Sequence, residues 1–235
     1  MKEKPAPPSR WLMIFSSLFI TALVVSNIVA VKLIALGPLV LPAGVIVFPI
    51  SYILGDVLTE VYGYAIARRI IWTGFFANLV AVIFIAISIH IPPVPFWQVN
   101  HFSSAEESQQ AFAAVLGFSP RLLIASFTAY LVGEFLNAFV MARLKVKTRG
   151  RFLWVRTIGS TIVGEGADSF IFIAVAFGGL YGAPALLGTA LSQWVFKTGY
   201  EILATPITYW VINHVKKAEN MDVFDEKTNF NPLKF

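Results

Sequence analysis

Long apolar stretches dominate this 235-residue chain, and short segments rich in glycine, proline or charge separate them. A helix needs about 20 apolar residues to cross the hydrocarbon core of a bilayer. Stretches of that length occur at Trp11–Leu36, Leu39–Tyr62, Ile66–Ile89, Leu122–Ala142, Thr157–Phe177 and Ala185–Val215. The pattern therefore predicts an all-α fold, a six-helix transmembrane bundle within residues 11–217.

The segments around these stretches indicate how the helices are connected. Gly37 and Pro38 link the first two stretches, and residues 178–184 link the last two, so both pairs are expected to be antiparallel neighbours. Residues 1–10 are polar and rich in proline, and we expect a disordered tail there. Residues 218–235 are expected to form a second tail.

The longest connection, Ile91–Arg121, carries a helical signal of its own. Ser103 or Ser104 can cap a helix, because Glu106 and Glu107 stand at capping-box spacing. A short apolar face follows, formed by Phe112, Val115 and Leu116. We expect an amphipathic helix lying on the external face of the membrane. A lid over an external entrance is the alternative.

The two halves of the chain have a similar order of polar residues. Three stretches precede the long connection and three follow it, so the halves have opposite orientations in the membrane. Asn27 and Asn137 lie late in the first helix of each half, and Asp56 and Asp168 lie on the second. This order is typical of two inverted three-helix repeats, which frame central sites in many transporters.

The positions of the charges set the orientation. The net charge is +5, and fifteen of the eighteen basic residues fall in the two tails, at the start of the third stretch and in the link after the fourth. These segments share one side of a six-span protein, and the positive-inside rule makes that side cytoplasmic. The basic loop around Lys145 has few aromatic residues, so we expect no nucleic-acid partner.

Composition excludes several other classes. The chain is 57% hydrophobic and only 13% charged, whereas soluble domains carry about 25% charged residues. Cysteine is absent and the three histidines stand far apart, so neither a disulfide nor a metal site is expected. Catalytic motifs such as HExxH and GxSxG are missing from the sequence, so we expect a non-enzyme without a cofactor.

Ionisable residues inside the apolar stretches carry the functional signal, since a charge at bilayer depth costs roughly 2.5–3.5 kcal/mol on insertion scales. The second stretch places Phe48, Tyr52, Asp56 and Glu60 four residues apart, on one face of a helix. Pro42 and Pro49 in the same stretch are expected to interrupt that helix and to free backbone carbonyls. The alternative for Glu60 is that it has no functional role and lies at the end of the helix, where cytoplasmic water solvates it.

The last three stretches carry similar stripes. Gln193, Lys197, Glu201 and Thr205 share one face of the sixth stretch, and Thr161, Glu165 and Asp168 share one face of the fifth. Lys197 can pair with Glu201 on its own helix or with the acids of the fifth. The fourth stretch has small residues at Ala125, Ala129 and Gly133, followed by Asn137, which favour close helix packing. Glu134 lies on the adjacent face.

Acids outnumber bases at depth. At bilayer depth, the apolar stretches contain six acidic residues and only two basic ones, Lys197 and Lys32. Lys32 can snorkel toward the outer surface. Uncompensated negative charge in a low dielectric must be protonated, hydrated or paired with a ligand. The excess favours a cationic or multi-donor substrate, or proton coupling, and argues against an anionic substrate.

Several segments resemble one known family. They are Ser26–Asn27, FPISYILGDVLTEVYGY (48–64) followed by ARR (67–69), ASFTAY (125–130), GEGADS (164–169) and Lys197. Together they resemble the queuosine precursor transporter family, also called the vitamin uptake transporter family, over roughly residues 26–206. The resemblance implies a multi-pass bacterial inner-membrane protein with cytoplasmic termini that takes up 7-cyano- or 7-aminomethyl-7-deazaguanine.

The residues suit such a base. A carboxylate of Asp56 or Asp168 can accept both donors of a guanine edge, Lys197, Gln193 or Asn27 can donate to O6, and an aromatic ring can stack on the base. The expected binding residues are Asn27, Phe48, Tyr52, Asp56, Glu60, Glu134, Asn137, Glu165, Asp168, Gln193, Trp194 and Lys197. The expected partners are the bilayer and a small flat heterocycle.

One alternative function and the oligomeric state stay open. A substrate-binding membrane subunit of an ATP-driven vitamin importer is the alternative function, because such subunits also have six helices. This chain has no nucleotide-binding motif, so we expect its energy to come from a gradient. The oligomeric state, with a homodimer as one option, is left open by the sequence.

Overall fold

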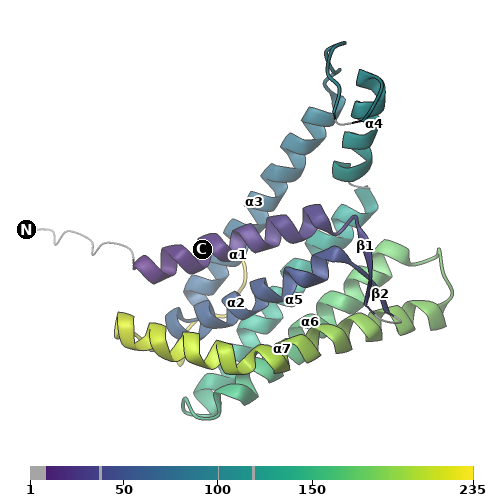
Figure 1. The fold of residues 1–235 in the computed structure, drawn as a ribbon. Helices are drawn as coiled ribbons and strands as arrows, with labels where there is room; N and C mark the ends of the chain where they lie inside the picture. The colour runs from purple at the N-terminus through teal and green to yellow at the C-terminus, as the bar shows by residue number, and fades with distance from the viewer. Residues whose placement is uncertain (1–8, 37–38, 100, 118–119, 235) are drawn as a thin grey trace, which may run out of the picture.

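Helices form almost the whole of the computed structural model, which describes residues 9–36, 39–99, 101–117 and 120–234 (Figure 1). The elements in chain order are α1 (Arg10–Val29), β1 (Leu33–Leu36), β2 (Leu39–Pro42), the 3₁₀ helix η1 (Ala43–Ile46), α2 (Phe48–Tyr62), α3 (Tyr64–His90), α4 (Ala105–Leu116), α5 (Pro120–Lys147), α6 (Leu153–Phe177) and α7 (Ala183–Glu219). The all-α membrane bundle that the sequence predicts is confirmed.

Five helical stretches of the described residues are long and apolar enough to cross a membrane. They lie within Arg10–Val29, Ala43–Tyr62, Tyr64–His90, the region of α4 and α5 (Ala105–Lys147) and Leu153–Phe177. The 37-residue helix α7 is not among them, and polar residues such as Lys197 and Glu201 interrupt its apolar character. A sixth crossing stays a prediction.

The junction between the first two helices differs from the prediction. We expected α1 to reach Leu36 and the next helix to begin at Leu39. Instead α1 ends at Val29, and Leu33–Leu36 pairs antiparallel with Leu39–Pro42. Hydropathy alone does not distinguish a short apolar strand from a helical segment, which explains the error. The expected turn at residues 37–38 lies outside the described residues.

Neither Pro42 nor Pro49 interrupts α2. Pro42 ends β2, and Pro49 stands in the first turn of α2. The missing N–H of proline costs nothing there, because the first-turn amides have no partner within the helix. The expected interruption of the helix was therefore wrong.

The ends of the chain pack close to the bundle. Residues 1–8 of the expected N-terminal tail lie outside the described residues, whereas Ser9 caps α1 by accepting from the Leu12 amide at 3.0 Å. The segment after α7 returns to α3: Arg68 donates to the carbonyls of Asn229 and Asn231, both at 2.8 Å.

The predicted helix in the long connection is present as α4. The Ser104 hydroxyl accepts from the Glu107 amide at 3.1 Å, and the Glu107 carboxylate accepts from the Ser103 amide at 2.7 Å. Gln109 donates to the Ile89 carbonyl at 2.6 Å and ties α4 to the end of α3. Figure 1 shows that this end of α3 and α4 project beyond the other helices. The position of α4 on the membrane surface stays a prediction.

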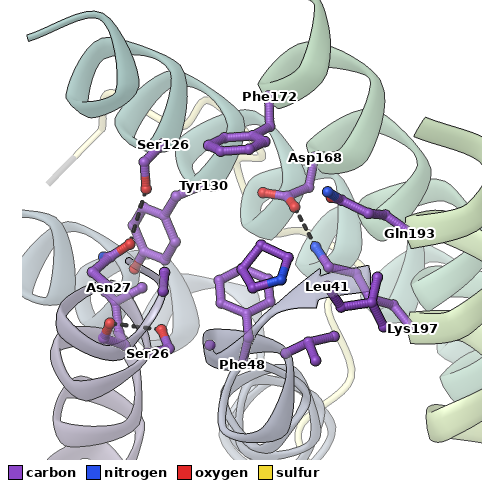
Figure 2. A pocket seen from close by; sticks show the side chains of 15 residues that line it. Ser26, Asn27, Leu41, Phe48, Ser126, Tyr130, Asp168, Phe172, Gln193 and Lys197 are labelled. Atoms are coloured by element: carbon purple, nitrogen blue, oxygen red, sulfur yellow. Dashed lines mark hydrogen bonds and ion pairs between the residues drawn. The ribbon is translucent and has the colours of Figure 1, made fainter. Parts of the chain in front are cut away.

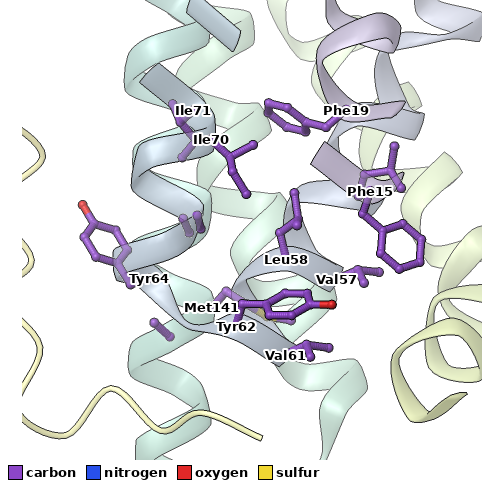
Figure 3. Packing of buried hydrophobic residues seen from close by; sticks show 14 of the residues in the cluster. Phe15, Phe19, Val57, Leu58, Val61, Tyr62, Tyr64, Ile70, Ile71 and Met141 are labelled. Atoms are coloured by element: carbon purple, nitrogen blue, oxygen red, sulfur yellow. The ribbon is translucent and has the colours of Figure 1, made fainter. Parts of the chain in front are cut away.

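A dense apolar core closes one end of the bundle. Its side chains come from the first half of α1, the second half of α2, the start of α3 and the end of α5, for example Phe15, Leu58, Ile71 and Met141 (Figure 3). Antiparallel packing brings these parts together, as the contact between Ser9 and the Tyr62 hydroxyl at 3.2 Å illustrates. In a bilayer such side chains hold helices together by van der Waals packing.

Two glycines allow α5 and α6 to approach closely. A methyl group at Gly164 would lie 2.7 Å from Asn137 Cβ and 2.9 Å from the Gly133 carbonyl oxygen. Neither atom belongs to a flexible side-chain end, so neither can move aside easily. Ala125 and Ala129, the small residues predicted to share this face, are also buried. The predicted packing role of the stripe is confirmed.

We expect Gly164→Ala to lower the free energy of unfolding by about 1–3 kcal/mol, because the added methyl overpacks the contact between α5 and α6. Gly188→Ala on α7 is the matched control, since a methyl group there meets nothing within 4 Å. Unfolding of both variants in detergent measures the difference. Equal stability of the two variants would contradict the close-contact account.

Candidate functional site

A cavity lies at the end of the bundle opposite the apolar core. The end of α1, β2 with η1, and the start of α2 form one side, and α5, α6 and α7 form the other (Figure 2). Its lining residues are Leu23, Ser26, Asn27, Ala30, Leu41, Pro42, Gly44, Val45, Phe48, Ser126, Tyr130, Asp168, Phe172, Gln193 and Lys197. The space between them is about 670 Å³, part of it open to the outside.

Lys197 is the charged centre of the cavity. Its Nζ lies 2.6 Å from Asp168 Oδ2 and 2.9 Å from Glu165 Oε2. The same ammonium lies 4.4 Å from the centre of the Phe48 ring, within range of a cation–π interaction. Lys197 thus pairs with the acids of α6, one of the two pairings that the sequence allowed.

The remaining walls combine polar and aromatic groups. Ser126 donates to Asn27 Oδ1 at 3.0 Å, while the Tyr130 hydroxyl donates to the Ile71 carbonyl at 2.9 Å. Phe48 and Phe172 supply aromatic rings, and Figure 2 shows them on either side of the cavity. Ring faces next to a buried charge pair suit a flat polar ligand.

Five of the twelve predicted binding residues line this cavity, namely Asn27, Phe48, Asp168, Gln193 and Lys197. Sequence reasoning missed Phe172, Ser126, Tyr130 and Leu41. Leu41 was missed because the hairpin was not expected. Phe172 carried no signal, since aromatic residues are frequent throughout the apolar stretches and only the helix register shows which of them face inward.

A second group of predicted residues is buried between the helices, beside the cavity lining. This group consists of Tyr52, Asp56, Glu134, Asn137 and Glu165. Within it, the Asn137 amide donates to Asp56 Oδ1 at 2.8 Å. Asn27 and Asn137, which an inverted repeat would make equivalent, therefore have different partners. The repeat stays a prediction.

Trp194 lies on the contact between α6 and α7. Its ring nitrogen donates to the Ile162 carbonyl at 2.9 Å, and the same ring lies against Gly166. The tryptophan is thus half-buried between two helices and outside the cavity lining. Its hydrogen bond joins helices, which is a packing role.

Glu60 lies at the opposite end, inside a cluster of cations. Arg156 holds both of its carboxylate oxygens, at 3.0 and 2.8 Å, and Lys216 donates to it at 2.6 Å. Lys145 donates to the Glu60 carbonyl at 2.5 Å. Within the described residues, Glu60 is thus fully engaged in closing this end and lies apart from the cavity.

The segment after α7 joins the same cluster through Asp222. Burial alone would raise the pKa of this carboxyl, but hydrogen bonds from Lys145 and Lys216 lower it below its usual value. Because the pKa is lowered, the stabilisation is present at neutral pH and is lost as the pH falls through that value. The segment therefore helps to fasten the closed end.

The fold and the cavity define a helical membrane protein with an internal polar site that is open toward one end and closed by charge pairs at the other. Residues 42–211 match the family model described as "Putative vitamin uptake transporter". The chain belongs to this vitamin uptake transporter family.

Three curated relatives resemble the chain. A "Probable queuosine precursor transporter" of Bacillus subtilis (strain 168) is 31% identical over 80% of this chain and 79% of its own length. A "Queuosine precursor transporter" of Escherichia coli (strain K12) is 28% identical over 71% and 67%. A "Probable queuosine precursor transporter" of Haemophilus influenzae is 30% identical over 57% and 51%. The chain matches no solved structure significantly.

We expect Glu60→Gln to lower the free energy of unfolding by about 3–5 kcal/mol, because it leaves the buried Arg156 without its anion. Glu106→Gln, the same substitution at an exposed position of α4, should have almost no effect. Denaturation in mixed micelles measures both. Similar stabilities of the two variants would show that the charge cluster does not close this end.

Proposed function

We propose that this protein takes up queuosine precursors, 7-cyano- and 7-aminomethyl-7-deazaguanine, across the bacterial inner membrane. The observation that carries the proposal is the ion pair of Lys197 and Asp168 inside a cavity with aromatic walls. The names of the relatives support the same substrate class.

The ion pair suits the polar edge of a guanine-like base. That edge presents two adjacent donors, the exocyclic amine and N1–H, followed by the acceptor O6. A carboxylate accepts from both donors as a bidentate pair, and Asp168 can do so while Lys197 or Gln193 donates to O6. Stacking on Phe48 or Phe172 then selects a flat ring. Each element of this recognition comes from a residue that lines the cavity.

The aminomethyl base adds a positive charge, which the acids near the cavity favour. Glu165 and Asp168 share one lysine, so the pair carries a net negative charge when both are ionised. A cationic substituent next to them gains Coulomb attraction in a medium of low dielectric constant. The cyano base carries no positive charge and lacks this Coulomb attraction, so its recognition depends on the guanine edge alone.

The direction of transport follows from the two ends of the bundle. The positive-inside rule assigns the charge cluster around Glu60 to the cytoplasmic side, and the cavity then faces the exterior. Substrate enters the cavity from outside and reaches the cytoplasm once that cluster opens. A gradient across the membrane provides the energy in this proposal.

We expect Asp168→Asn and Lys197→Met to weaken binding of 7-cyano-7-deazaguanine about 10- to 100-fold, since each removes a charge-assisted hydrogen bond of about 1.5–3 kcal/mol. Lys217→Met on the exposed end of α7 is the control and should bind like the wild type. Calorimetry on the purified proteins measures all three. Wild-type affinity in both cavity variants would refute this recognition mode.

Reconstitution in liposomes separates a self-sufficient carrier from a subunit of an ATP-driven importer. We expect the purified chain alone to accumulate 7-cyano-7-deazaguanine in vesicles when a gradient is imposed. No accumulation without added ATPase subunits would favour the importer subunit.

A further inference from the structure

Three buried carboxyl groups on the described helices make no ion pair. They are Asp56 on α2, Glu134 on α5 and Glu201 on α7, and each is almost completely buried. The salt bridges among the described residues involve Glu60, Glu165, Asp168 and Asp222 instead. A buried carboxylate without a cation is costly, so such a group is protonated or has a ligand.

Asp56 and Glu201 have the most incomplete hydrogen bonding. Asp56 Oδ1 accepts from the Asn137 amide, but Asp56 Oδ2, Asn137 Oδ1 and both carboxylate oxygens of Glu201 have no partner. The helices that carry the two residues, α2 and α7, pack against each other. All these unpartnered atoms are acceptors, so each of them needs a hydrogen-bond donor. A protonated carboxyl supplies the missing donor.

The charged groups nearby are already engaged. Lys197, one helical turn from Glu201, is held by Glu165 and Asp168, and Arg156 is held by Glu60. Glu134 on α5 and Tyr52 on α2 add no positive charge. Lys197 and Arg156 are therefore not available to neutralise Asp56 or Glu201, which favours a proton as the neutralising group.

The position of the pair connects the two ends of the molecule. Along α2, Asp56 lies two turns after Phe48 of the cavity and one turn before Glu60 of the closed end. Loss of the proton would create negative charge between the two salt-bridge clusters. That charge would compete with Glu165 for Lys197 and with Glu60 for its cations. Proton binding and release here therefore act on both ends.

We propose that Asp56 and Glu201, with Asn137 as the hydrogen-bonding partner of Asp56, form the proton-binding site that couples transport to a proton gradient. This inference rests on the proposed uptake function. The proton enters from the external side onto the pair and leaves to the cytoplasm when the closed end opens. A metal ion is disfavoured, because the described residues contain no group of three or more acidic, histidine or cysteine side chains able to hold one.

The test uses the full chain in liposomes with a pH indicator inside and 7-cyano-7-deazaguanine outside. For the wild type we expect a proton gradient, acidic outside, to stimulate uptake at least 10-fold, with protons entering alongside the base. Asp56→Asn and Glu201→Gln should lose this stimulation while keeping exchange of external for internal base. Glu219→Gln, the same substitution at the end of α7, should behave like the wild type.

The outcomes separate this inference from the function on which it rests. Absence of binding and exchange in the wild type refutes the proposed function. Wild-type exchange with stimulation by sodium instead of protons, or full proton stimulation in both variants, refutes the proton site alone.

Labelling of the wild type covers the case in which the variants do not fold. Dicyclohexylcarbodiimide modifies protonated carboxyls in apolar surroundings, and mass spectrometry locates the product. We expect modification of Asp56 or Glu201 that decreases as the pH rises. Modification confined to other residues would overturn the assignment.

Discussion

The contact of Lys197 with Asp168 and Glu165 is the interaction on which the interior of this protein depends. A lysine in the middle of a long helix must be neutralised when it is buried, and the acids of α6 lie 2.6 and 2.9 Å from its ammonium group. The contact fixes how α7 lies against α6. It also places a hydrogen-bond donor and an acceptor side by side in the cavity.

The two ends of the bundle have opposite characters, and this asymmetry suggests how a carrier can work. At one end, apolar packing and the pairs made by Glu60 exclude water. At the other, the strands β1 and β2 interrupt the helices and leave a cavity. Between the ends lie buried acids without cations. In the proposed cycle, the closed end must open before the substrate can leave the protein.

The helical bundle and part of the candidate site could be predicted from the sequence. Charged residues in apolar stretches are costly enough to be noticed without a structure, and Asp168 and Lys197 do meet in the cavity. Spacing alone could not place Glu60, because its partners Arg156 and Lys216 come from distant segments. The spacing also could not reveal the hairpin, since an apolar strand has the same composition as an apolar helix. Phe172 could be identified as a cavity residue only from the register of α6.

An experimental structure with 7-cyano-7-deazaguanine bound tests the central claim most directly. We predict that the base lies in the cavity, with its N1 and amine edge on Asp168, its O6 toward Lys197 and a face of its ring against Phe48 or Phe172. A base bound elsewhere, or a cavity in which Lys197 and Asp168 face away from the ligand, would contradict the account.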